Sequence, residues 1–193
     1  GSKPANKPVV ASDLDPAVIT GQTALATSPA DTDEFLISDA GVLKRLDASL
    51  IGGGGKVLQV VQGTQGLFAT TSTSFTTTGL DAAITPGASN SKVLITVTMN
   101  QTSISAANKN ATATLLRGST NLAPSGSGQH KAMGVNYNAG SGGAVNITFQ
   151  FLDTPNTTNA TTYTVHVAAE SGATITMGIN STTSFIQLME IGA

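Results

Sequence analysis

The side chains that could bind a metal ion or transfer a proton are few in this sequence. Its 193 residues include two histidines, no cysteine and eleven acidic residues. His166 and Glu170 are four residues apart, a spacing that would place them on one face of a helix, as in many zinc sites. On a strand they would lie about 13 Å apart along the chain at ~3.3 Å per residue, too far to bind one ion. Because the residues around them alternate with a period of two, we expect a strand, a solvent-facing His166, no metal site and no cofactor.

Covalent and acid–base catalysis have little support in the sequence. The chain lacks Gly-x-Ser-x-Gly, the motif that presents the nucleophile of α/β-hydrolases. Glycoside cleavage needs two carboxyl groups, and only Asp81, Asp153, Glu170 and Glu190 follow residue 55. Asp81 follows Gly79-Leu80 and Asp153 precedes a proline, so both are expected to cap turns. We therefore predict no catalytic residue and a protein that is not an enzyme.

Asparagine and tyrosine side chains beside loops indicate recognition of a weak, polar ligand such as a surface glycan. Loops on a rigid scaffold are the usual place for binding residues, and we expect four long polar loops, at 100–110, 119–130, 138–143 and 153–162. The predicted receptor-binding residues are Asn108, Lys109, His130, Lys131, Tyr137, Asn138 and Asn156. Ordinary solvated loops with a half-buried tyrosine are the alternative interpretation.

The loops must be held by β-strands, because apolar residues recur at every second position after residue 55. Such alternation buries one face of a strand and leaves the other in water. The predicted strands are 56–62, 67–78, 93–99, 111–117, 131–137, 145–151, 163–167, 175–179 and 184–191. They predict an all-β fold, an antiparallel β-sandwich of jelly-roll type. The last strand is apolar on both faces, so we expect it in the centre of its sheet or at a subunit interface.

Residues 1–55 have no credible core of their own. Four glycines at 52–55 end this segment, which holds seven of the eleven acidic residues and four of the nine basic ones. We predict two domains, an extended shaft or neck at 1–55 and a head at 56–193. Residues 34–38 and 42–46 predict a β-hairpin with glycine in its turn. Because one hairpin is marginal in water, we expect the segment to intertwine with copies of itself.

The low charge content argues against several classes of protein. Only 10% of residues are charged, 47 are serine or threonine, and the net charge is −2. Nine scattered lysines and arginines make no basic stripe, so nucleic-acid binding is not expected. No stretch of about 20 mostly apolar residues predicts a membrane span, so no membrane insertion is expected. The lack of cysteine excludes a disulfide framework and fits assembly in a reducing cytoplasm.

Short motifs are spread along most of the chain. The run TALATSPADTDEFLISDAGVLKR at 23–45 resembles a segment of bacteriophage tail fibre and other virion structural proteins, where it precedes the C-terminal tips. Later motifs are TSFTTTGL at 73–80, SKVLI at 91–95, LLRG at 115–118, FLDTP at 151–155, TTYTV at 161–165 and LMEI at 188–191. They include no catalytic signature, so no active site is carried over.

This resemblance implies a homotrimeric fibre end that belongs to the virion and is assembled in the host cytoplasm. The implied partners are other virion proteins and a host cell-surface receptor, most simply a polysaccharide. The tips of such fibres are often compact β-sandwiches, some of them similar to the jelly roll of tumour necrosis factor.

Three other functions stay open from the sequence. One is a purely structural virion component, such as a capsid decoration or collar fibre. The second is a polysaccharide depolymerase, and the third is an adhesin module of a bacterial surface.

Overall fold

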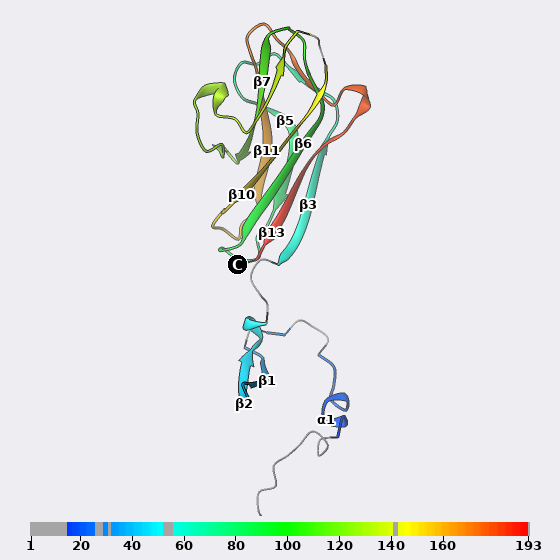
Figure 1. The fold of residues 1–193 in the computed structure, drawn as a ribbon, viewed down its shortest axis with the longest axis vertical. Helices are drawn as coiled ribbons and strands as arrows, with labels where there is room; N and C mark the ends of the chain where they lie inside the picture. Colours follow the sequence, from blue (N-terminus) through cyan, green and yellow to red (C-terminus); the bar gives the residue numbers. More distant parts are fainter. Residues whose placement is uncertain (1–14, 26–28, 31, 52–55, 141–142, 193) are drawn as a thin grey trace, which may run out of the picture. The chain divides into compact units, whose positions relative to one another are not determined.

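The structure is a computed structural model that describes residues 15–25, 29–30, 32–51, 56–140 and 143–192 (Figure 1). The chain is all-β with antiparallel strand pairs, as predicted. It divides into two compact units, residues 1–53 and 54–193. The boundary predicted at the four glycines 52–55 falls outside the described residues. No helix in the described part of the chain is long and apolar enough to cross a membrane.

The smaller unit contains the predicted hairpin. β1 (Glu34–Asp39) pairs with β2 (Val42–Asp47) in register, and Ala40 and Gly41 form a turn with positive φ. A single helical turn, α1 (Ala17–Thr20), and a 3₁₀ turn, η2 (Ala48–Leu50), complete the described elements. No residue of β1 or β2 is buried. Within its described residues this unit therefore has no core that would hold the hairpin together.

The larger unit consists of strands and short 3₁₀ turns. In chain order its elements are β3 (Val57–Gln65), β4 (Phe68–Thr70), β5 (Thr76–Ile84), β6 (Lys92–Ile104), β7 (Lys109–Arg117), β8 (Thr120–Asn121), η3 (Gly128–His130), β9 (Gly134–Asn138), β10 (Val145–Asp153), β11 (Thr161–Ala169), β12 (Ile175–Met177), η4 (Ile179–Ser181) and β13 (Ser184–Ile191).

The strands form two sheets. In the first, β3, β13, β6 and β10 are neighbours in that order, and β12 and β4 extend the sheet beside the last residues of β6. In the second, β5, β11 and β7 are neighbours, and both β8 and β9 pair with β7. The predicted central position of the last strand is confirmed, because β13 lies between β3 and β6.

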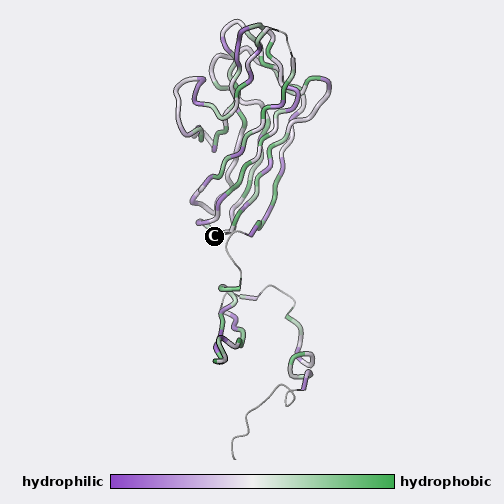
Figure 2. The backbone as a smooth tube through the Cα atoms, viewed as in Figure 1, coloured by the Kyte–Doolittle hydropathy of each residue, from purple (hydrophilic) through white to green (hydrophobic). Residues whose placement is uncertain are grey.

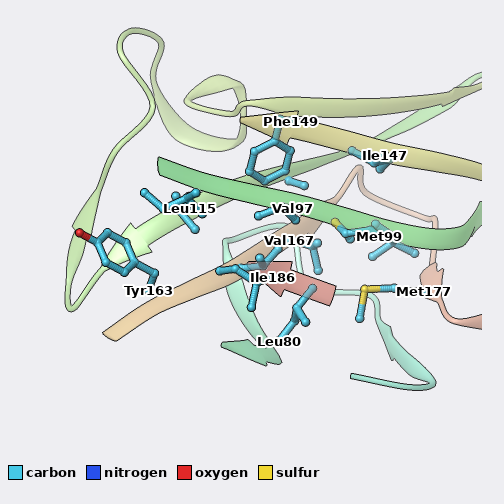
Figure 3. Close-up of a cluster of buried hydrophobic side chains, with 14 of the residues drawn as sticks. Leu80, Val97, Met99, Leu115, Ile147, Phe149, Tyr163, Val167, Met177 and Ile186 are labelled. Carbon is cyan, nitrogen blue, oxygen red and sulfur yellow. The ribbon is translucent and has the colours of Figure 1, made fainter. Parts of the chain in front are cut away.

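One hydrophobic core lies between the two sheets (Figure 3). The alternation seen in the sequence places Val93, Ile95, Val97 and Met99 of β6 in this core, fully buried. The tube coloured by hydropathy shows the same alternation along the strands (Figure 2). Burying each such side chain contributes about 1.5–3 kcal/mol. The core therefore fixes which residues of every strand point outward.

Two predicted breaks in the strands are wrong. Residues 100–104 were expected to lie in a loop, but β6 continues through them, and Thr102 and Ile104 are buried. Gln101 has a positive φ of 47°, and the pairing of β6 with β10 shifts there. The bulge shifts by one residue the positions that point inward. The apolar alternation of the sequence is therefore interrupted at residue 100, where the predicted strand ended. Asp81, expected in a turn, lies in β5, where Gly79 (φ 75°) marks a bulge rather than a turn.

The larger unit has two ends. At the β6–β7 end, the β6–β7 turn lies beside the β9–β10 and β11–β12 connections, as hydrogen bonds from Asn108 to Asn138 and from Ser105 to Thr174 show. At the C-terminal end, β3 begins and β13 ends (Figure 1). The two ends present different sets of loops, so their side chains cannot act on one ligand.

Candidate functional site

Four predicted binding residues come together at the β6–β7 end. Lys109 of β7 pairs with Asn138 of β9, and Asn110 pairs with Tyr137. Asn108 has a positive φ of 56° in the turn before β7. Its backbone N–H donates to the Asn138 carbonyl (2.6 Å), and the Tyr137 hydroxyl approaches its side-chain oxygen at 3.4 Å. Tyr137 keeps 58% of its surface exposed, so its ring is available to a ligand.

Asn138 has a structural role in this group. Its side-chain N–H donates to the carbonyl of Ile104 (3.0 Å), and its side-chain oxygen accepts from the backbone N–H of Gly140 (3.0 Å). The first bond joins β9 to the last residue of β6, and the second fixes the backbone at the start of the β9–β10 connection. Residues 141 and 142 of the predicted loop 138–143 lie outside the described residues.

Glu170 joins the group from the end of β11. One carboxylate oxygen accepts from Lys109 Nζ (2.9 Å), and the other accepts from the backbone N–H of Asn110 (3.1 Å). The hydrogen bond from Lys109, with help from Asn110 and the nearby charge of His130, holds the pKa of Glu170 below its usual value. The ion pair gives this end one positive and one negative charge, so the two charges add no net charge.

A hollow of about 320 Å³ adjoins this group on the outer face of β7 and β9. Thr112 and Val135 are direct cross-strand partners beneath it. The residues that line it are Thr112, His130, Ala132, Met133, Gly134 and Val135. The segment before β9 stays against β7 because the Met133 N–H donates to the Ala113 carbonyl (2.8 Å). Tyr137 follows Val135 on the same face of β9, two residues nearer the β6–β7 end.

The bottom of the hollow carries a polar atom without a partner. Thr112 is only 5% exposed, and its hydroxyl has no hydrogen-bond partner among the described residues. Asn110 Oδ1 and His166 Nδ1 are also buried and without a partner. All three lie on the outward positions of β7 and β11, since Thr112 pairs with Ala168 and His166 with Thr114. Buried polar groups are almost always hydrogen-bonded, so these three atoms keep hydrogen-bonding capacity that groups of the described chain do not use.

His166 is more enclosed than the sequence suggested. It is half-buried, and burial lowers its pKa below the usual value, against a smaller effect of a hydrogen bond with the backbone of Phe75. The imidazole is therefore neutral at pH 7. The neighbouring strands β5 and β7, which flank it at Thr77 and Thr114, explain why a strand residue that faces away from the core is not free in solvent.

The remaining predicted residues divide between the two ends. Lys131 follows His130 in the segment that forms one wall of the hollow, and its backbone carbonyl accepts from the Asn121 side chain (3.0 Å). Asn156 lies in the β10–β11 connection at the C-terminal end. Arg117, at the end of β7, pairs with Tyr163 shortly after that connection. Lys109 lies eight residues away at the start of β7, a distance of about 26 Å along the strand. Asn156 therefore does not join the other six residues.

The sequence alone offered no sign of Thr112 or of Glu170 as binding residues. Thr112 is one of 29 threonines, and its importance comes from the register between β7 and β9. The sequence suggested Glu170 only as a metal ligand beside His166 or as a carboxylate that could cleave a sugar chain. Its contact with Lys109 depends on β11 pairing with β7, which no local pattern reveals.

Asp153 and Glu170 do not form a pair suited to glycoside cleavage. Asp153 accepts two hydrogen bonds from Arg117 (2.8 and 2.9 Å) and one from Tyr163 (2.7 Å) at the C-terminal end. Glu170 lies seven residues further along β11 than Tyr163, about 23 Å away, whereas such carboxyl groups stand about 5–9.5 Å apart. In the described part of the chain, no three His, Asp or Glu side chains gather closely enough to hold a metal ion.

No protein-family model matches the chain, and no curated protein matches it. What the site binds is therefore inferred from its geometry and from the motifs that resemble those of phage tail fibres.

Proposed function

We propose that this chain is the C-terminal part of a bacteriophage tail fibre, a homotrimer whose larger unit binds a polysaccharide of the host surface at the hollow beside Tyr137. The observation that carries this proposal is the buried, unpartnered Thr112 hydroxyl in the lining of a hollow, with the exposed Tyr137 two residues further along β9 than Val135 of that lining. The fibre motifs of the sequence supply the biological setting.

The order of the strands supports a jelly-roll head. The four longest strands of the first sheet run β3-β13-β6-β10, and those of the second run β5-β11-β7-β9. Apart from β7 and β9, which are neighbours in the second sheet, successive strands among these eight cross between the two sheets, as in the double-sheet jelly rolls of viral capsid and lectin domains. This is an analogy of fold, and the site must carry the function.

The chemistry of the hollow suits a sugar. A sugar ring presents hydroxyl groups that both donate and accept, and an apolar face. Thr112 and His130 offer polar atoms at the bottom and wall of the hollow, and Ala132, Met133 and Val135 offer apolar surface. A volume of about 320 Å³ lies at the small end of the ~300–1,000 Å³ typical of small-molecule sites. One short stretch of a longer glycan would fit, with the Tyr137 ring against its face.

One site of this size would bind a glycan weakly. A trimer would compensate, because it carries three such sites. Three linked copies raise overall avidity by a factor of about 10² or more when all can reach the same surface. The smaller unit supports such an association, because its hairpin exposes apolar side chains and has no core among its described residues.

Binding of the full chain to an array of purified bacterial lipopolysaccharides and capsular polysaccharides tests the proposal. We expect at least one polysaccharide to bind, and Tyr137→Ala to weaken that binding about tenfold or more, as loss of ~1.4 kcal/mol would. Asn108→Gly and Asn156→Gly form a matched pair, since both residues have a positive φ (56° and 53°) that glycine tolerates. Asn108→Gly should weaken binding, and Asn156→Gly should not.

The outcomes separate the alternatives. A trimer that binds no polysaccharide and no intact bacterial cells would favour a purely structural virion component. Release of reducing ends from a bound polysaccharide would favour a depolymerase. Equal losses from Asn108→Gly and Asn156→Gly would overturn the assignment of the binding site to the β6–β7 end.

A further inference from the structure

The outer face of the first sheet carries an apolar row that crosses four strands. Val60 of β3 pairs with Met189 of β13, Met189 with Leu94 of β6, and Leu94 with Leu152 of β10. Cross-strand partners point to the same side of a sheet, and this side faces away from the core. Val60 and Leu152 are 52% and 51% exposed, and Leu58 near the start of β3 is also exposed.

This row is unusual for its place. On strands that are half-buried, outward positions are normally polar, and the next row along the same strands is polar. It consists of Gln62, Gln187, Thr96 and Gln150, again direct partners across the sheet. We call the outer face made by these two rows, together with Leu58 and Ile191, the apolar–amide face.

The apolar–amide face is almost without charge. Lys92, the partner of Ile191 at the edge of the face, is the one charged residue on the outward rows. The amide and hydroxyl groups of the polar row both donate and accept, and Gln150 Nε2 already donates to Thr96 Oγ1 (3.1 Å) within it. A second copy of the same row can therefore satisfy it, whereas a strongly acidic or basic partner has no counter-charges to meet.

The face is also large enough to supply part of a protein contact. Four strands at about 4.8 Å, and about six residues at about 3.3 Å along each strand from the polar row to Ile191, span roughly 380 Å² in projection, before side-chain relief is counted. A stable interface takes about 800 Å² of accessible surface from each partner. The face could supply about half of one such contribution.

We infer that the apolar–amide face is the contact between the larger units of neighbouring copies of this chain. The inference rests on the association of copies in the proposed function. Because the smaller unit has no core of its own among its described residues and joins the larger unit through residues 52–55, copies that associate there hold their larger units close together. At the resulting high effective concentration, an uncharged face with an apolar row is where they meet.

Cysteine accessibility in the full chain tests this inference, because the chain has no native cysteine. Leu152→Cys reports on the face, and Leu67→Cys, an equally small change at an exposed leucine in the β3–β4 connection, is the control. In the oligomer we expect a polyethylene-glycol maleimide to modify Cys at position 152 at least about tenfold more slowly than at position 67. In urea the two rates should be equal.

Cross-linking and sedimentation make the result decisive. Bis-maleimide should join chains carrying Leu152→Cys much more efficiently than those carrying Leu67→Cys. Equal reaction rates in an oligomer verified by sedimentation would overturn the proposed face but not the association of copies. A chain that sediments as a monomer would overturn both, while polysaccharide binding, measured separately, would still test the hollow.

Discussion

Thr112 is the residue at which binding and stability are expected to oppose each other. Its hydroxyl is buried beneath the hollow and has no partner among the described residues. An unpaired buried hydroxyl costs about 1–3 kcal/mol, a cost that a bound sugar hydroxyl or a water molecule would offset. Residues of this kind are typical of binding sites, where a protein gives up stability for function.

We therefore predict that Thr112→Val keeps or raises stability while weakening polysaccharide binding. Valine has the shape of threonine without the hydroxyl, so the change removes the unpaired group and leaves the packing intact. We expect the free energy of unfolding to rise by up to about 1 kcal/mol. Chemical denaturation and array binding, at one protein concentration, measure the two effects.

Thr114→Val is the matched control for this prediction. Thr114 lies two residues along the same face of β7 and is fully buried, but its hydroxyl donates to Asn121 Oδ1 (2.8 Å). Its replacement should lower stability by about 1 kcal/mol and change binding less. If Thr112→Val destabilises the protein as Thr114→Val does and leaves binding unaltered, the Thr112 hydroxyl has a structural role.

At the scale of the element, β13 is held in place by a buried carboxylate. Glu190 is 1% exposed, near the end of β13. Its two oxygens accept from the Gly87 N–H (2.7 Å) and from Gln59 Nε2 (2.6 Å). Burial by itself would raise the pKa of Glu190, but the hydrogen bonds from Gln59 and from the backbone of residues 87 and 88 outweigh it and lower the pKa. The carboxylate thus joins β13, β3 and the β5–β6 connection.

This arrangement predicts a loss of stability in acid. Because the folded pKa of Glu190 lies below its ordinary value of 4.5, its contribution is present at pH 7 and is lost as the pH falls below about 4.5 through the folded pKa. Glu190→Gln presents an N–H₂ group to a donor, so we expect about 1–3 kcal/mol less stability at pH 7. The difference from the natural protein should shrink as the pH falls.

Urea denaturation at pH 7 and in steps down to pH 3 measures this effect. Asp81→Asn, which changes an exposed carboxylate of β5, is the control and should change stability little at either pH. A difference between Glu190→Gln and the natural protein that stays constant from pH 7 to pH 3 would contradict the prediction.

Comparison of the strands with the sequence shows which of them could be predicted from local patterns. Strict alternation located β6, β10 and β11, because each has one face in the core, and β13 stood out as a strand that is apolar on both faces. The sequence failed where a bulge shifts the alternation, as at Gln101 in β6 and Gly79 in β5. It also failed where a strand is too short for a pattern, as in β4 and β8.

The candidate site was predictable only in part, because it depends on pairing between distant strands. Asn108 and Tyr137 stood out as loop-edge residues suited to recognition, and the structure brings them together. Nothing local distinguished Thr112, whose position beneath the hollow follows from the pairing of β7 with β9. Asn156 has the same residue type and backbone conformation as Asn108, and only the topology separates them.

At the scale of the whole molecule, the smaller unit sets the oligomeric state in the proposed fibre. Leu36 and Leu43 lie on one face of the hairpin, since Leu36 pairs with Arg45 and Leu43 with Ser38. They are 75% and 70% exposed. Removing each from water in a shared shaft would contribute about 1.5–3 kcal/mol, an upper estimate because the unfolded chain is already partly collapsed.

We predict that the full chain sediments at three times the 19.3 kDa of one chain and that Leu36→Glu with Leu43→Glu weakens this association at least about tenfold. The two carboxylates would have to be buried against their copies, at a cost that no basic residue of this hairpin face except Arg45 can offset. Leu67→Glu, the same change at an exposed leucine of the larger unit, should leave the trimer intact. Sedimentation equilibrium at micromolar concentration measures all three, and circular dichroism checks that the larger unit stays folded. A natural chain that sediments at 19.3 kDa would remove the basis of the shaft, and a trimer unaffected by both glutamates would move the contact between copies away from the hairpin.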